Sequence, residues 1–209
     1  VSSHAIAQHR ADSVNFSIAA FTNITQDHLD YHASFEEYAD AKLRLFSKLC
    51  PESGTAVINA DGDGAERFID VARVRGQKVL TVGRKGADLA LRKATPLPAG
   101  LAIEVSSGAR DWSLNLPLIG AFQAENALLA AGIVIAAGAE IEDAVPLLEK
   151  LSGVPGRMQR TAEVAGAGVY VDYAHTPDAV ATALQAVRPH ARGRVIAIIG
   201  AGGDRDDAK

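Results

Sequence analysis

The chain has 209 residues, of which 48% are hydrophobic and 22% charged, a composition that is typical of globular proteins and excludes a disordered chain. The net charge is −4 and no block of about five or more basic residues occurs, so we expect no nucleic-acid partner and no membrane partner. Cys50 is the single cysteine, which excludes an intramolecular disulfide and is typical of a cytoplasmic protein. The longest apolar run, residues 127–137, has about half the length that a bilayer requires.

The first predicted element is a strand over residues 14–24, where apolar and polar residues alternate. Acidic and imidazole side chains follow it in the stretch TQDHLDYH, residues 25–32. His28 and His32 have the i, i+4 spacing of zinc ligands on a helix, but no glutamate follows the first histidine and no cysteine is near. Solvated loop residues are one interpretation. The other is that His28 binds a hard cation such as Mg²⁺, because a helix with an unusual lysine follows.

That lysine is Lys42, in a helix predicted over residues 34–49. Ser34 and Glu37 form a capping box at its start. Lys42 lies in the middle of an apolar stripe, at about 100° per residue, although the opposite face offers many polar positions. The stripe consists of Phe35, Tyr38, Ala39, Leu45, Phe46 and Leu49, and the polar face of Glu36, Glu37, Asp40, Arg44, Ser47 and Lys48.

Two interpretations of Lys42 are open. Its stem can lie along apolar surface while the ammonium group reaches water. Alternatively, a partly desolvated lysine amine is easier to deprotonate, and the neutral amine can react with CO2 to give a carbamate. A carbamate on Lys42 would be a carboxylate-like ligand for a metal ion.

Hydrophobic patterns predict the remaining elements of the first domain. Residues 54–60 and 77–83 have the apolar runs of buried strands, and a hairpin turns near residues 107–109. Residues 121–138 are apolar almost all round and end with a glycine, so we predict a buried helix. Another helix is predicted over residues 141–151, with two acidic residues in its first turn.

The stretch NADGDGAERFID, residues 59–70, has the oxygen-ligand spacing of a calcium loop. A predicted strand precedes it where a calcium-binding helix–loop–helix motif needs a helix, and Asp70 stands where a bidentate glutamate is preferred. We therefore interpret this stretch as a turn between a strand and a helix.

Two glycines and a proline interrupt the pattern in residues 152–160, which predicts a domain boundary. The predicted domains are residues 1–154 and 155–209. The fold class is α/β: a mostly parallel sheet with flanking helices, followed by the beginning of a second, Rossmann-like α/β domain. That second domain starts with two predicted strands flanking a helix that Thr176 caps and Pro177 begins, namely 168–173, 193–203 and 178–187.

Several polar residues lie near the predicted ends of these strands. Asp172 and His175 follow the first strand of the second domain, at the edge where α/β sheets bind ligands. Arg157, at the domain boundary, could reach a phosphate held between two domains. The stretch GAGGDR follows the last strand, but a dinucleotide-binding loop would need glycine in place of Arg205, so a nucleotide-dependent oxidoreductase is the less favoured alternative.

Taken together, several stretches resemble the Mur ligases: VSSHAIAQHR, TNITQDHLDYH, the helix of Lys42, GAFQAENALLAA, VPGRM, VDYAHTPDA and GAGGDRD. The similarity runs from the first residue to the last, and is strongest to the members that complete the muramoyl tripeptide. The resemblance implies a cytoplasmic enzyme of peptidoglycan synthesis. Such an enzyme joins meso-diaminopimelate or L-lysine to UDP-N-acetylmuramoyl-L-alanyl-D-glutamate, with ATP as a substrate and through an acyl phosphate. It also implies that residues 1–154 belong to the central, ATP-binding domain and residues 155–209 to the carboxyl-terminal domain.

The resemblance implies a role for each matching residue. Two cations and an arginine would offset the charge of phosphoryl transfer between two anions. The implied catalytic residues are carbamylated Lys42, His28 and His175, with Lys42 and His28 as ligands of Mg²⁺. Residues implied to hold the UDP-linked peptide are Ser2, Gln8 and Arg10, and those implied to contact the nucleotide are Asn126, Arg157 and Asp172.

The chain also departs from the family pattern. No G-x-x-x-x-G-K-[ST] phosphate loop occurs, and the first residue is Val1 rather than methionine. We therefore expect a fragment of a longer ligase, and expect that this fragment by itself neither hydrolyses ATP nor ligates an amino acid. Another Mur ligase or a ligase resembling folylpolyglutamate synthetase is the alternative within this class.

Overall fold

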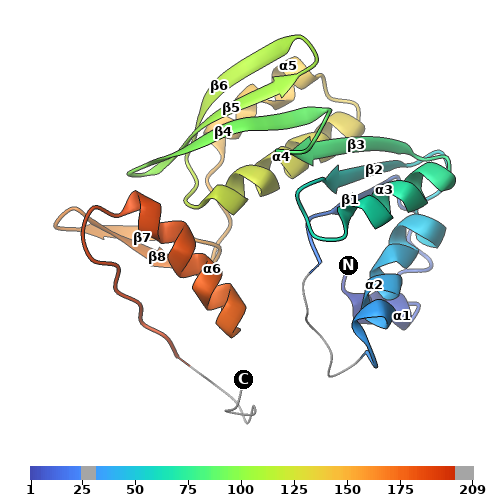
Figure 1. The fold of residues 1–209 in the computed structure, drawn as a ribbon, viewed down its shortest axis with the longest axis horizontal. Helices are drawn as coiled ribbons and strands as arrows, with labels where there is room; N and C mark the ends of the chain where they lie inside the picture. Colours follow the sequence, from blue (N-terminus) through green and yellow to red (C-terminus); the bar gives the residue numbers. More distant parts are fainter. Residues whose placement is uncertain (25–31, 201–209) are drawn as a thin grey trace.

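The computed structural model describes residues 1–24 and 32–200, and its main feature is a six-stranded sheet (Figure 1). The strand order follows the sequence, β1-β2-β3-β4-β5-β6. The first four strands pair in parallel and the last three are antiparallel. The strands are β1 Ile18–Phe21, β2 Thr55–Asn59, β3 Lys78–Gly83, β4 Leu89–Leu97, β5 Gly100–Ser107 and β6 Arg110–Leu116.

The sheet separates two hydrophobic clusters. One cluster joins β2 to β6 with helix α4, Ala121–Ala136, and the other joins β1 and β2 with α2, Phe35–Arg44, and α3, Ala65–Val74. Gly132 lets α4 approach the sheet closely, since a Cβ atom there would lie 2.8 Å from Val57 Cγ1. Every residue of β2 is buried, because helices cover both faces of this strand.

Several predicted elements of the first domain are confirmed. Strands β2 and β3 lie within the predicted ranges 54–60 and 77–83, and the hairpin turns between Ser107 and Arg110. The predicted strand over 14–24 is too long: β1 pairs with β2 only over Ile18–Phe21, and Val14 is exposed. No strand was predicted where β4 lies, because two basic residues at a bulge interrupt its alternation.

The two predicted helices that follow the sheet also differ from expectation. Helix α4 is confirmed, but it is not buried all round: Val134 is 50% exposed, so one face packs on the sheet and the other does not. The helix predicted over 141–151 is wrong as a single element. It divides into α5, Ile141–Ala144, and a 3₁₀ turn η2, Pro146–Lys150, because Pro146 lacks the N–H that would continue the helix.

The Lys42 helix begins as predicted and ends differently. The hydroxyl of Ser34 accepts from the Glu37 N–H at 3.1 Å, and the Glu37 carboxylate accepts from the Ala33 N–H at 2.8 Å. Helix α2 ends at Arg44 and widens into a π-helix, η1, Leu45–Leu49. Buried Tyr38, Ala39 and Phe46 confirm the apolar stripe, whereas Phe35 at its edge is 39% exposed.

The described elements that follow residue 158 form a small second unit. Strands β7, Gln159–Val164, and β8, Ala167–Val171, pair as an antiparallel hairpin, and α6, Pro177–Val187, follows with a short 3₁₀ turn η3, Arg188–His190. Thr176 caps α6 as predicted, since its hydroxyl accepts from the Ala179 N–H at 3.3 Å. Among the described residues, no helix is long and apolar enough to cross a membrane.

The strand predicted over 193–203 does not form in its described part. Residues 193–200 lie outside any strand, and Ile198 is 99% exposed. A strand needs a neighbour that accepts its backbone hydrogen bonds, and in the described second unit β7 and β8 pair with each other alone. The predicted βαβ unit is therefore a strand, a helix and an extended segment, while residues 201–203 lie outside the described residues.

Candidate functional site

Lys42 lies near the end of α2 and is half-buried. Its Nζ lies over the ring of Tyr38, 5.0 Å from the ring centroid, and Tyr38 itself is buried. The face of an aromatic ring attracts a cation, so this arrangement stabilises the charged amine. The lysine stem follows the apolar stripe, which agrees with the sequence analysis. Carbamylation of Lys42 and its role as a metal ligand stay predictions.

His28, the other proposed metal ligand, lies outside the described residues. His28 falls within residues 25–31, which the structure does not describe, as do the acidic residues of the same stretch. His32 is described: it is 2% exposed, and its Nε2 lies 3.0 Å from the hydroxyl of Ser3. Within residues 1–24 and 32–200, no group of three or more His, Cys, Asp or Glu side chains could hold a metal ion.

The residues proposed to hold the UDP-linked peptide flank helix α1, Ser3–Ala7, which packs beside α2. Ser2 caps α1, because its hydroxyl accepts from the Ala5 N–H at 3.2 Å. Gln8 and Arg10 follow the last turn and are exposed. The proposed peptide-binding residues thus lie at the two ends of a helix that packs beside the helix of Lys42.

The link between these two helices was missed by the sequence analysis. Arg44 was assigned to the polar face of its helix, but it reaches across to α1: Nη1 donates to the Ile6 carbonyl at 3.1 Å and to Asp12 Oδ1 at 2.7 Å. Nη2 donates to Asp12 Oδ2 at 2.6 Å. An acidic residue 32 positions away carries no local pattern that identifies it as a partner of Arg44.

The calcium-like stretch forms the predicted turn. Asp61 accepts the N–H groups of Arg84 at 2.5 Å and Lys85 at 3.0 Å, so its carboxylate orders the loop after β3. Gly64 precedes α3 and has φ of +75°, a left-handed conformation that glycine adopts without strain. Asn59, at the end of β2, donates to the carboxylate of Glu125 at 3.3 Å.

That contact places the first turns of α4 at the carboxyl end of β2, and Asn126 follows Glu125 directly. Asn126 is exposed. Burial raises the pKa of Glu125, whereas the bond from Asn59 lowers it. Glu125 and Asn59 were not among the predicted site residues, although Asn59 lies at the carboxyl end of a predicted buried strand, a position typical of ligand-binding edges.

The second unit meets α4 at the predicted boundary. Gln123 Nε2 donates to the Arg157 carbonyl at 3.4 Å, one helical turn before Asn126. The Asp172 carboxylate accepts the Met158 N–H and the Ala174 N–H, each at 2.8 Å. Asp172 therefore ties the end of β8 to the segment that carries Arg157.

Around that tie, exposed side chains gather. The Arg157 guanidinium lies 5.6 Å from the ring centroid of Tyr173, and the rings of Tyr173 and His175 meet edge to face at 5.2 Å. His175 Nδ1 lies 3.0 Å from the Tyr173 carbonyl. Arg157, Asp172 and His175 thus lie near one another, and the Arg157 carbonyl lies beside the first turn of α4. Their roles as site residues stay predictions. The GAGGDR loop begins at the last described residue, so its interpretation is untested.

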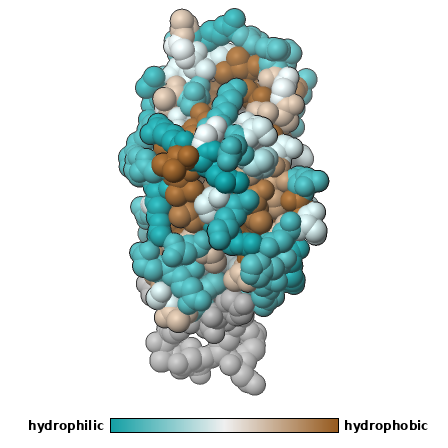
Figure 2. Space-filling model, turned by 90° about the vertical axis from the view of Figure 1, so that its right-hand side faces the viewer, coloured by the Kyte–Doolittle hydropathy of each residue, from teal (hydrophilic) through white to brown (hydrophobic). Residues whose placement is uncertain are grey.

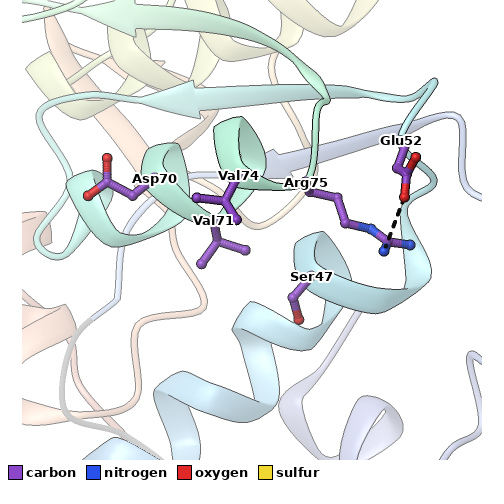
Figure 3. Close-up of a pocket in the computed structure, with 6 residues that line it drawn as sticks. All are labelled: Ser47, Glu52, Asp70, Val71, Val74 and Arg75. Atoms are coloured by element: carbon purple, nitrogen blue, oxygen red, sulfur yellow. Dashed lines mark ion pairs between the residues drawn. The ribbon is translucent and has the colours of Figure 1, made fainter.

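A cavity of about 460 Å³ lies elsewhere, between α3 and the loop before β2 (Figure 3). Val71 and Val74 form its apolar wall, and Arg75 pairs with Glu52 at 3.7 Å across it. No proposed site residue lines this cavity. The side of the molecule that carries α1, α2 and α3 shows apolar side chains in small patches separated by polar ones (Figure 2).

Two family profiles match the chain. The Mur ligase middle domain matches residues 1–134, and the Mur ligase glutamate ligase domain matches residues 156–209. Two curated proteins named UDP-N-acetylmuramoyl-L-alanyl-D-glutamate--2,6-diaminopimelate ligase are similar. The one from Caulobacter vibrioides is 50% identical over 209 residues, which are 100% of this chain and 43% of that protein. The one from Bradyrhizobium diazoefficiens is 45% identical over 212 residues, 100% of this chain and 44% of that protein.

Solved structures agree with these matches. A structure of a ligase with the same name has a TM-score of 0.79 and 34% identity, and the match covers 99% of this chain and 42% of that chain. The MurF ligase of Thermotoga maritima in complex with ADP, 19% identical with a TM-score of 0.69 over 87% of this chain and 41% of that chain, shares the fold. The chain spans less than half the length of these relatives. Its two matching domains, in this order, show that the chain belongs to the Mur ligase family.

Proposed function

We propose that this chain is the central part of an ATP-dependent ligase that adds the third amino acid of the muramoyl peptide. The acceptor would be UDP-N-acetylmuramoyl-L-alanyl-D-glutamate, here called the UDP-muramoyl dipeptide. The observation that carries the proposal is the 50% identity to a ligase of that name along all 209 residues. The names of the relatives favour diaminopimelate over lysine as the incoming amino acid. As in the sequence analysis, the chain by itself is expected to be inactive, and the whole protein to be cytoplasmic.

The geometry supports a division of labour between two groups of residues. Ser2, Gln8 and Arg10 border α1, where their polar groups would hold the acidic peptide, and Arg10 would supply a positive charge. Asn126, Arg157 and Asp172 lie around the first turns of α4, where they would contact ATP. His175, beside Arg157 and Tyr173, belongs to the second group. The domain limits at residues 154 and 155 are part of this proposal.

Lys42 is proposed to act as a carbamate together with His28. Mg²⁺ suits this pair, since it keeps several waters and takes one or two protein ligands plus substrate phosphates. Mg²⁺ would supply electrostatic stabilisation of the phosphoryl group in transfer. The half-buried amine of Lys42, on a helix fixed by the packing of Tyr38 and Phe46, would hold the carbamate in one place.

The test of the proposed function uses a full-length protein that carries this segment. It is incubated with ATP, Mg²⁺, the UDP-muramoyl dipeptide and diaminopimelate, and the product is identified by mass. The expected product is heavier than the dipeptide substrate by one diaminopimelate residue, with one ADP formed per product. Absence of product together with turnover on a folate or a nicotinamide substrate would contradict the proposal.

Lys42→Arg tests the carbamate separately. Arginine keeps a cation near Tyr38 but cannot form a carbamate, so we expect ligation to fall by about a hundredfold or more. In ¹³C-bicarbonate, the full-length protein should show a carbamate resonance that Lys42→Arg lacks. Equal activity of the two proteins would refute the proposed role of Lys42.

A further inference from the structure

Arg44 makes the bonds that join α1 to α2. Its guanidinium binds Asp12 through both nitrogens, at 2.7 and 2.6 Å, and donates to the Ile6 carbonyl at 3.1 Å. The Arg44 side chain is 21% exposed, so solvent screens this pair less than it screens an open surface pair. Two parallel N–H···O bonds also fix the orientation of both side chains.

These bonds act on the segment that ends α1. The Ile6 carbonyl, in the last turn of α1, accepts the His9 N–H at 3.1 Å, and Arg44 adds a second bond to the same carbonyl. His9 has φ of +60°, a left-handed conformation that is strained for a residue with a Cβ atom. Its Nδ1 lies 2.7 Å from Asp12 Oδ2, so the carboxylate that binds Arg44 also holds His9 in this conformation. The segment is therefore built around the Arg44–Asp12 pair.

Gln8 and Arg10 flank His9, so their positions depend on this turn. The Arg10 N–H donates to the Ala5 carbonyl at 2.9 Å, which closes the end of α1. We propose that Arg44 is a positioning residue that holds Gln8 and Arg10 for the acidic peptide substrate and fixes them relative to Lys42, two residues away on the same helix. This inference rests on the proposed function of the family segment.

A second arginine pair on α2 provides a matched control. Arg67, on α3, pairs with Glu36 and Asp40 on the outer face of α2. It is 41% exposed and its bonds reach side chains on α2 but no residue of α1. Each arginine makes two bonds to carboxylate oxygens between α2 and a neighbouring segment, but Arg44 alone of the two contacts the segment with Gln8 and Arg10.

The kinetic test uses the full-length protein with Arg44→Gln, Arg44→Lys, Asp12→Asn and Arg67→Gln. For Arg44→Gln and Asp12→Asn we expect KM for the UDP-muramoyl dipeptide to rise about tenfold, while kcat and KM for ATP change less than about twofold. Arg44→Lys should lie between, because lysine keeps the charge without the bidentate geometry. Arg67→Gln should leave all three parameters unchanged.

Amide hydrogen exchange on the 209-residue chain tests the same inference without catalysis. The Arg10 amide should exchange at least about tenfold faster in Arg44→Gln and not in Arg67→Gln. The exchanged pair Arg44→Asp with Asp12→Arg should restore part of the protection, which also covers the case that a single variant fails to fold.

The outcomes separate the two proposals. If the unmodified full-length protein does not use the UDP-muramoyl dipeptide, the proposed function fails. If it does, but Arg44→Gln leaves KM for that substrate within about twofold of the unmodified protein, the positioning role is refuted. A uniform loss of kcat with unchanged KM would also refute it, because it would indicate a contribution to the chemical step.

Discussion

Gln77 makes a testable contribution to the stability of the Lys42 helix. It precedes β3 and is 6% exposed, and its Nε2 donates to the carbonyls of Phe46 and Cys50, each at 2.9 Å. A third carbonyl, of Pro51, lies 3.3 Å away. Phe46 lies within η1 and Cys50 directly follows it, so the helix offers their carbonyls no partner, whereas the Pro51 carbonyl also accepts the Gly54 N–H at 3.0 Å. One buried amide thus closes the element that continues α2.

The expected magnitude follows from the number of bonds. Replacing Gln77 by methionine keeps the shape of the side chain but removes the donor, so two buried carbonyls lose their partner. An unsatisfied buried polar group costs about 1–3 kcal/mol, and the substitution also removes Gln77 Oε1, a buried acceptor without a partner among the described residues. The net change is one additional unsatisfied group, so we expect Gln77→Met to lower the free energy of unfolding by about 2 kcal/mol. In a chain of this size that corresponds to a fall in Tm of about 4–8 °C. Gln77→Ala should cost more, because it also leaves a cavity.

The assay is urea unfolding followed by far-UV circular dichroism, combined with amide exchange at Cys50, whose N–H donates to the Leu45 carbonyl at 2.8 Å within η1. Exchange at Cys50 reports on the end of η1 even if the second unit unfolds separately. A free energy of unfolding for Gln77→Met within about 0.5 kcal/mol of the unmodified chain would refute the reasoning. So would unchanged exchange at Cys50.

Three further predictions concern other contacts. The bonds from Arg44, and to a lesser degree from His9, hold the pKa of Asp12 well below its usual value of 3.8. The free energy of unfolding should therefore fall as the pH drops below about 4, and Asp12→Asn should remove this acid dependence in urea unfolding. Burial raises the pKa of Glu125 above 4.5, so its charged form destabilises the fold as the pH rises; Glu125→Gln should raise Tm at pH 8 more than at pH 5. His190 Nε2 accepts from the Gly120 N–H at 3.2 Å, so His190→Ala should speed exchange of the Gly120 amide about tenfold, and an unchanged rate would contradict a role for this bond in docking the second unit.

Hydrophobic periodicity predicted the elements in which the pattern of buried and exposed side chains is constant from end to end. Strand β2 is buried on both faces, and its continuous apolar run was sufficient to identify it. Strand β4 was missed because Arg92 and Lys93 lie at a bulge, where the alternation of faces breaks. The hydrophobic pattern predicted one helix over 141–151. Pro146 has no N–H to continue the helical hydrogen bonds, so the segment divides there.

Hydrogen bonds between residues far apart in the sequence limited how much of the candidate site could be predicted. The Ser3–His32 contact joins residues 29 positions apart, and no local pattern predicts which serine a buried histidine will reach. The extended segment 193–200 illustrates the same limit for strands. Its apolar residues predict a strand, yet a strand exists only where a neighbour accepts its hydrogen bonds.

The two basic residues Lys42 and Arg44 show when a helical wheel misassigns a charged side chain. By angle alone, Lys42 belongs to the buried stripe and Arg44 to the solvent face. In the structure the Lys42 amine stays over the ring of Tyr38, a residue of the same stripe, whereas the Arg44 guanidinium leaves its sector and lies against the end of α1. A helical wheel gives only the direction of each Cα–Cβ bond. The charge of a lysine or an arginine lies several bonds farther out, and its position depends on the group that it contacts. Because α2 holds Lys42 and also holds α1 through Arg44, a shift of this helix would move the proposed metal ligand and the proposed peptide-binding residues together.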